Sequence, residues 1–143
     1  MMKRLRNQRG AALLETAITI PIVLVVTVSV FEFGRAYQTW QVLTNAAREG
    51  ARVAVLAEST DAQVSDAVKT YMKSGKLPAA TSATVTVERT VPFNGASTAS
   101  RITVSYPFNF TVLNPVMRLV KKGTTTGQGT TMMSSVALMR NES

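Results

Sequence analysis

The longest hydrophobic segment of the chain lies close to its N-terminus. The 16 residues between Glu15 and Glu32, TAITIPIVLVVTVSVF, carry no charge. The run is too long for a strand, although it is rich in β-branched residues, so it predicts a helix. Counted from Ala11 through Phe33, this helix is roughly 34 Å long, enough to cross a hydrocarbon core of about 30 Å. Residues 11–36 are therefore expected to form the transmembrane half of a long helix.

Helical spacing continues beyond the apolar run. Small and apolar residues recur there every three or four positions, at Ala36, Trp40, Leu43, Ala47, Ala51 and Ala54. This stripe extends the predicted helix to about Ala57 and provides an apolar face that can cover a sheet. Pro21 is expected to kink the helix locally. Gly34 and Gly50 either permit close helix approach or simply add flexibility.

A second, shorter helix is predicted after residue 59. Thr60 and Gln63 have the spacing of a capping box, and Gly75 followed by Pro78 is a typical stop. One face of this helix is expected to hold Val64, Ala67, Val68, Tyr71 and Met72. The segment is therefore predicted to form an amphipathic helix that packs beside the long one.

The hydrophobic period changes to two after residue 83. Residues 84–91 alternate between valine and polar residues, NGAS predicts a turn, and Ile102 to Phe110 alternate again. Pro107 favours an edge strand or a strand end. LNPVMRLV is expected to form a short helix, and TMMSSVALMR a last strand. The predicted fold class is α+β, with a long N-terminal helix, a second short helix and a small antiparallel sheet of about three strands.

Charge predicts the orientation of the chain. The formal net charge is +8, and four excess basic residues precede the apolar run, namely Lys3, Arg4, Arg6 and Arg9. Such an asymmetry places the N-terminus in the cytoplasm and residues 37–143 outside it, as an extracytoplasmic α+β domain. The remaining excess is spread thinly, so nucleic acid is not an expected partner. A cleaved secretory signal fits less well, because the run is long, contains an early glutamate and lacks a small-x-small cleavage site.

The residues available for catalysis are few. The chain has no cysteine and no histidine. This excludes disulfide scaffolds, thiol nucleophiles and imidazole acid–base pairs, and it disfavours zinc. Asp61, Asp66 and Glu88 are too scattered to name a catalytic pair. We therefore expect no enzyme activity, no metal and no cofactor or small-molecule substrate.

The residues RGAALLETA resemble the processing site of type IV pilins. A basic leader, residues 1–10, ends in Gly10, and a glutamate, Glu15, is the fifth residue counted from Ala11. The downstream FEFGRAYQTWQVLTNAAREGARVAV and the ending VALMRNE resemble TadE-like minor pilins, or pseudopilins, of tight adherence (Tad/Flp) pili. Thr16 stands where major Flp pilins usually have tyrosine, and the chain is longer than they are.

The resemblance implies a maturation pathway and a location. A prepilin peptidase would cut between Gly10 and Ala11, with methylation of the new amine as a further step. The protein would reside in the bacterial inner membrane and later in a surface fibre for adhesion, biofilm formation or DNA uptake. Its partners would be other pilins and minor pilins of the Tad system and the pilus assembly platform. Glu15 would pair with the ammonium group of Ala11, on the same subunit or a neighbouring one.

Simpler interpretations remain beside these. Glu15 is also acceptable in a first helical turn, where the helix dipole is positive. Several charged residues lie three or four positions apart, so each is either a solvated helix charge or a subunit contact: Glu32, Arg35, Arg48, Glu49 and Arg52. The whole chain also fits an uncleaved single-span membrane protein whose outer domain binds a partner in a secretion or assembly complex.

Overall fold

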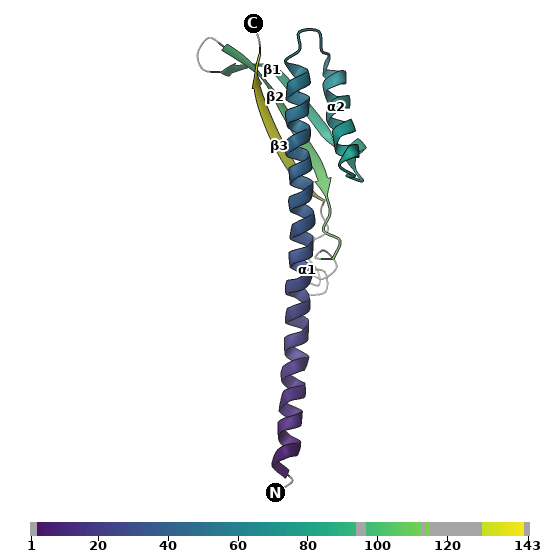
Figure 1. The fold of residues 1–143 in the computed structure, drawn as a ribbon, viewed down its shortest axis with the longest axis vertical. Helices are drawn as coiled ribbons and strands as arrows, with labels where there is room; N and C mark the ends of the chain where they lie inside the picture. The colour runs from purple at the N-terminus through teal and green to yellow at the C-terminus, as the bar shows by residue number, and fades with distance from the viewer. Residues whose placement is uncertain (1–2, 94–96, 113, 115–129, 142–143) are drawn as a thin grey trace.

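A computed structural model of the chain describes residues 3–93, 97–112, 114 and 130–141. The helices are α1, Lys3–Ala54, and α2, Asp61–Ser74, followed by a short 3-10 turn η1, Ala80–Ser82. The strands are β1, Thr84–Phe93, β2, Ser97–Phe108, and β3, Thr131–Arg140. The predicted α+β class is confirmed, and Figure 1 shows the small domain built around one end of the long α1.

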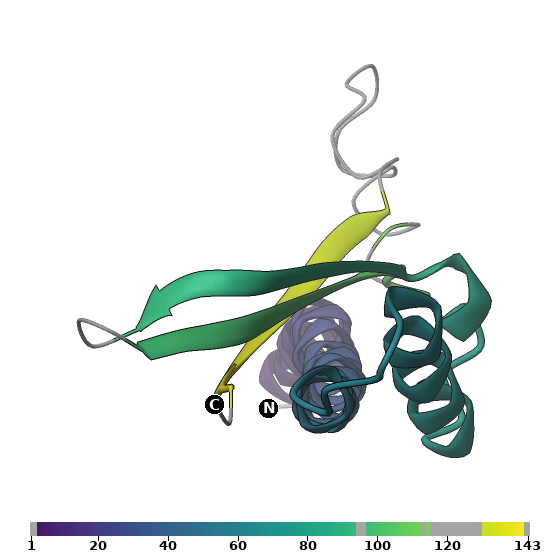
Figure 2. The ribbon, with the colours of Figure 1, turned by 90° about the horizontal axis from the view of Figure 1, so that it is seen from above.

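The sheet is antiparallel with the order β1-β2-β3, so β2 is its central strand. Both helices lie on the same face of this sheet, as the view from above in Figure 2 shows. Alternate residues of β2 point toward the helices and are buried, including Ile102, Val104 and Tyr106. This alternation is the period-two pattern that the sequence contains, since one face of the sheet is covered and the other is not.

The C-terminal part of α1 covers the sheet with small side chains. Leu43, Ala47, Ala51 and Ala54 of the predicted stripe are buried. Trp40 is not, and its placement on the covering face was wrong. Its side chain is 44% exposed, whereas that of its neighbour Thr39 is buried. The helix ends at Ala54, three residues before the expected end, and it continues through Pro21 without a break.

Helix α2 begins and ends as its sequence predicts. The capping box is confirmed, because Thr60 Oγ1 accepts from Gln63 N and Gln63 Oε1 accepts from Thr60 N. Gly75 caps the C-terminus. Its buried residues are Val64, Val68 and Met72, whereas Tyr71, predicted on the same face, is 39% exposed and was wrongly placed.

The two helices approach closely at Gly50. A Cβ atom there would lie 2.5 Å from Val68 Cγ2, closer than such atoms pack. Gly50 therefore permits the contact between α1 and α2, as one of the two interpretations of this glycine held. A Cβ atom at Gly34 would meet nothing within 4 Å, so that residue makes no such contact in the described part of the chain.

The strands overlap the predicted segments, but β2 ends at Phe108, two residues before the predicted Phe110. Pro107 does not lie on an edge strand. It is the second-last residue of the central β2, so the strand-end alternative is the correct one. Most of the predicted NGAS turn and of the predicted LNPVMRLV helix lies outside the described residues.

Candidate functional site

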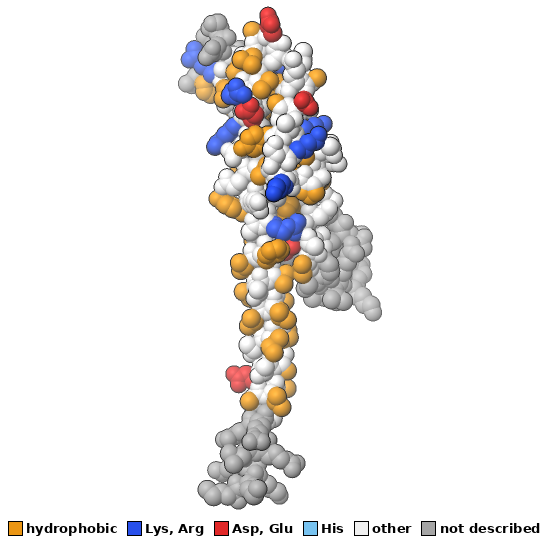
Figure 3. Space-filling model, turned by 45° about the vertical axis from the view of Figure 1, so that its right-hand side comes forward, with side chains coloured by type: hydrophobic (Ala, Val, Ile, Leu, Met, Phe, Trp, Pro, Cys, Tyr) orange, Lys and Arg blue, Asp and Glu red, His pale blue; other side chains and the backbone are white. Residues whose placement is uncertain are grey.

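The half of α1 that lies below the domain is bare. All described side chains from residue 10 to residue 27 are exposed, and apolar side chains cover much of this surface in Figure 3. Its hydroxyl groups are satisfied within the helix: Thr16 Oγ1 donates to Ala12 O and Thr19 Oγ1 to Glu15 O, each at 2.8 Å. The mean hydropathy reaches 2.2, so this helix is long and apolar enough to cross a membrane. A span of this kind needs its polar groups satisfied internally.

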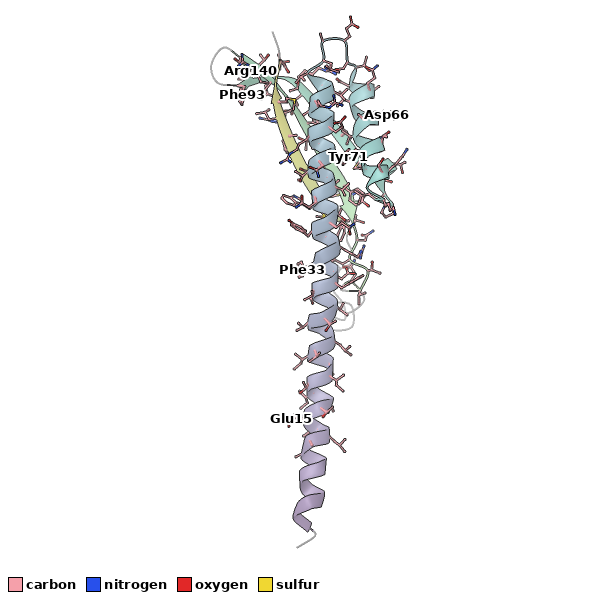
Figure 4. The ribbon with its side chains drawn as sticks, viewed as in Figure 1. Glu15, Phe33, Asp66, Tyr71, Phe93 and Arg140 are labelled. Carbon is pink, nitrogen blue, oxygen red and sulfur yellow. The ribbon has the colours of Figure 1, made fainter. Side chains whose placement is uncertain are left out.

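Glu15 is the acidic residue of this bare half. Its side chain is exposed and projects from the helix, as Figure 4 shows. Within the described residues, no ion pair includes Glu15. A carboxylate at the centre of a bilayer costs about 2.5–3.5 kcal/mol and less near the edge, so a partner would stabilise it there. Its pairing with Ala11 stays a prediction.

The predicted cleavage position lies inside α1. Helix α1 begins at Lys3, so the bond between Gly10 and Ala11 is within the helix and not at its start. Both residues are exposed, and a Cβ atom at Gly10 would meet nothing within 4 Å. The basic residues of the leader belong to the same helix, and they are Lys3, Arg4, Arg6 and Arg9. Cleavage after Gly10 would give α1 a new, charged N-terminus one helical turn from Glu15.

Glu32 is the other acid of the N-terminal region, and it is completely buried. Its Oε1 accepts from Arg35 Nη1 at 3.0 Å, and its Oε2 accepts from the backbone N–H of Thr111 at 2.9 Å. Arg35 Nη1 also donates to Thr111 Oγ1 at 2.7 Å. We call these three residues the stalk clamp. The clamp binds the segment after β2 to α1, at the level where the bare half ends.

The Arg35 side chain has a second contact that completes the clamp. Its guanidinium lies 5.4 Å from the centre of the Phe108 ring, within the range of a cation–π interaction. Phe108 packs edge-on against Phe110, with ring centres 5.1 Å apart. These intrachain contacts account for the spacing of Glu32 and Arg35 without a second subunit. A subunit contact by this pair stays a prediction.

The other predicted charge pair lies near the opposite end of α1. Arg52 donates to both carboxylate oxygens of Glu49, at 3.0 and 2.6 Å. The hydrogen bond from Arg52 lowers the pKa of Glu49 below its ordinary value, so the pair is ionised at neutral pH. Arg48 is exposed on the same part of the helix. Arg48, Glu49 and Arg52 are thus on the surface, and their role as subunit contacts stays a prediction.

Arg89 is a structural residue that the sequence interpretation missed. Its Nε donates to Asp61 at 2.8 Å, and its Nη1 donates to Ala54 O at 3.0 Å and to Ser59 Oγ at 3.2 Å. Ala54 O is one of the carbonyl groups that the end of α1 leaves without a helical partner. Arg89 thereby joins the end of α1 to the start of α2. The available signal was a basic residue at an inward position of the alternation in β1.

An open groove lies between the C-terminal part of α1, the connection that follows it and α2. Its volume is about 1220 Å³. Its lining combines apolar, uncharged polar and acidic residues, namely Glu49, Val53, Leu56, Ala57, Glu58, Ser59, Gln63, Asp66, Ala67, Thr70, Tyr71 and Ser74. In the described part of the chain, no three acidic side chains come together in a way that could hold a metal ion. The groove lies on the domain, far from Glu15.

The geometry defines a protein with one N-terminal helix that could cross a membrane and a small α+β domain built around its C-terminal part. The model of the TadE-like protein family matches residues 10–52, which confirms the resemblance over the segment that follows the leader. The match indicates a protein associated with the Tad pilus machinery. No curated protein and no solved structure matches the chain.

Proposed function

We propose that this protein is a minor pilin, or pseudopilin, of a tight adherence pilus. It is inserted into the inner membrane through the bare half of α1, cut after Gly10 by a prepilin peptidase, and incorporated into a surface fibre or used to start one. The family match over residues 10–52 supports this proposal, because the matched region begins at the predicted cleavage position. Its role is structural and assembly-related, with no catalysis and no cofactor.

The observation that carries the proposal is Glu15 on the bare helix. An exposed carboxylate in an apolar helix is unfavourable in lipid unless it has a partner. The ammonium group of Ala11, released by cleavage, is four residues away, which is roughly 6 Å along a helix. The same group on a neighbouring subunit would fix the axial register of two packed helices. In the fibre the domain lies outside, and it serves adhesion and biofilm formation.

The first experiment determines the mature N-terminus. Protein isolated from cells that contain the pilus machinery is analysed by mass spectrometry, and we expect Ala11 to be the first residue, with or without an added methyl group. An intact Met1 in assembled material would contradict the proposal. It would favour the alternative, an uncleaved single-span protein whose outer domain binds a partner.

The second experiment tests Glu15 against its neighbour. Glu15→Ala should leave membrane insertion intact and strongly reduce piliation. Thr16→Ala is the matched control, because Thr16 is also exposed and its hydroxyl bonds only to Ala12 of its own helix among the described residues. Normal fibres in the Glu15 variant would assign that residue to the helix dipole alone.

A further inference from the structure

Exposed aromatic side chains lie on α1 just above its bare half. They are Phe31, Phe33, Tyr37 and Trp40, which are 65%, 65%, 61% and 44% exposed. We call this set the aromatic collar. Figure 4 shows Phe33 on the side of α1 away from the segment that follows β2. The faces of the helix that the domain leaves uncovered at this level therefore include four aromatic side chains.

The collar is polar as well as apolar. The rings of Tyr37 and Trp40 lie with their centres 6.2 Å apart, and Gln41 Nε2 donates to the Tyr37 hydroxyl at 2.6 Å. Tyrosine and tryptophan present an apolar ring and a polar tip, and they are enriched where a membrane meets water. A segment whose only aromatic residues were phenylalanines would lack these polar tips.

The length of α1 places the collar at one surface of a membrane. If Ala11 lies at one edge of the hydrocarbon, Phe31 is roughly 30 Å away, which is the thickness of the hydrocarbon core. Trp40 is then roughly 44 Å away, and helical side chains lean back toward the N-terminus. Since each headgroup layer adds about 5–8 Å to the hydrocarbon, the collar extends from the outer edge of the hydrocarbon at Phe31 to the outer surface of the headgroups, toward which the Trp40 ring leans back.

The stalk clamp shields the negative charge of Glu32, which would be unfavourable at the edge of the hydrocarbon. Glu32 lies within the collar region of the sequence, yet it is completely buried and bonded to Arg35 and Thr111. A free carboxylate at the edge of the hydrocarbon would be costly, whereas a paired and buried one is shielded from lipid. The collar therefore presents aromatic rings to its surroundings with no exposed acid among them.

We propose that the aromatic collar is a membrane-seating surface. Its rings lie among the headgroups of the outer leaflet and fix the height at which the α+β domain stands above the lipid. A lipid surface is the occupant that fits, because the collar directly continues the bare apolar cylinder and combines it with interfacial residue types. The inference rests on the membrane span proposed above, and it adds a second, shallower contact to that span.

The chain contains one tryptophan, so its fluorescence reports on the collar alone. The full-length protein is reconstituted into phosphatidylcholine vesicles whose lipids are brominated either near the headgroup or near the chain ends. We expect Trp40 to be quenched several times more strongly by the shallow bromines than by the deep ones. Ile20→Trp, combined with Trp40→Phe, should show the reverse order because residue 20 lies inside the bare half.

The matched control moves the tryptophan onto the domain. Val136 on β3 is 57% exposed, so Val136→Trp with Trp40→Phe should be quenched by neither lipid. Equal quenching of Trp40 and of this control would overturn the inference while leaving the span intact, provided that the Ile20 variant is quenched. Loss of quenching in the Ile20 variant as well would overturn both. Acrylamide in the aqueous phase quenches exposed tryptophan. If Trp40 is protected from acrylamide only at high protein-to-lipid ratios, a second copy of the protein covers the collar, and the inference is also wrong.

Discussion

Replacing Glu32 by glutamine removes one negative charge from the interior while keeping the size of the side chain. In the native chain both carboxylate oxygens accept hydrogen bonds, one from Arg35 and one from the Thr111 backbone. The glutamine keeps one acceptor oxygen, so its amide group must face one of these two donors. Two donors then confront each other at a side chain that is completely buried.

The expected loss follows from the bond that is removed. A hydrogen bond to a charged group contributes about 1.5–3 kcal/mol, and a donor that is left without a partner adds to the cost. Arg35 is 37% exposed and keeps its bond to Thr111 Oγ1, which reduces the penalty on its side. We expect the Glu32→Gln domain to lose about 2–3 kcal/mol of unfolding free energy. For a domain of this size the melting temperature should fall by roughly 10–20 °C.

The measurement is hydrogen–deuterium exchange of the full-length protein in detergent micelles during a temperature ramp. The β2 amides report unfolding of the sheet, and the peptide that contains Thr111 reports release of the clamp. Glu49→Gln is the matched control, because Glu49 also pairs with an arginine three residues later but at the surface. Exposed pairs contribute little, so this variant should melt close to the native protein.

The comparison of the two variants tests whether the buried clamp stabilises the domain more than an exposed ion pair does. If Glu32→Gln melts no lower than Glu49→Gln, the buried clamp contributes nothing beyond an exposed pair. Faster exchange at Thr111 without a change in β2 would show that the clamp holds only its own segment and not the domain.

Two further predictions use pairs of positions within the domain and its helix. Gly50→Ala should destabilise the domain by about 1–2 kcal/mol, because the added Cβ overlaps α2. Gly34→Ala, with open space around it, should instead gain up to about 1 kcal/mol from helix propensity. Thermal unfolding of both variants checks this, and equal effects would contradict the close approach of the helices at Gly50. Arg89→Met should cost about 2 kcal/mol by freeing the ends of both helices. Arg101→Met, which breaks the exposed pair with Glu88, should leave the melting temperature almost unchanged; similar losses in the two variants would refute a special role for Arg89.

Local sequence patterns predicted the elements of this fold well, because each depends on neighbours along the chain. The capping box at Thr60, the helix stop at Gly75 and the alternation in β2 each depend on residues within a few positions of one another. The failures concern tertiary packing. Trp40 has helical spacing that suits the covering face, but the sheet accepts small side chains and leaves the large ring outside.

The site residues divide in the same way. Gly10 and Glu15 were predicted from the fixed spacing of a family motif, and their roles stay predictions, although the family match begins at Gly10. The buried state of Glu32 could not be predicted, since its partner Thr111 lies 79 residues away in sequence. Arg89 was missed for the same reason, because its three acceptors, on Ala54, Ser59 and Asp61, lie 28 to 35 residues before it in the sequence.

The order of the strands also determines when the domain can form. The last strand of the chain, β3, pairs with the central β2 and contacts α1, which is the first element to be made. Until β3 arrives, one edge of β2 and the part of α1 that contacts β3 have no partner. Contacts between distant parts of a chain form late and leave unpaired strand edges exposed in the meantime. Folding of the domain must therefore wait until synthesis, and any transport across a membrane, has delivered the C-terminal residues.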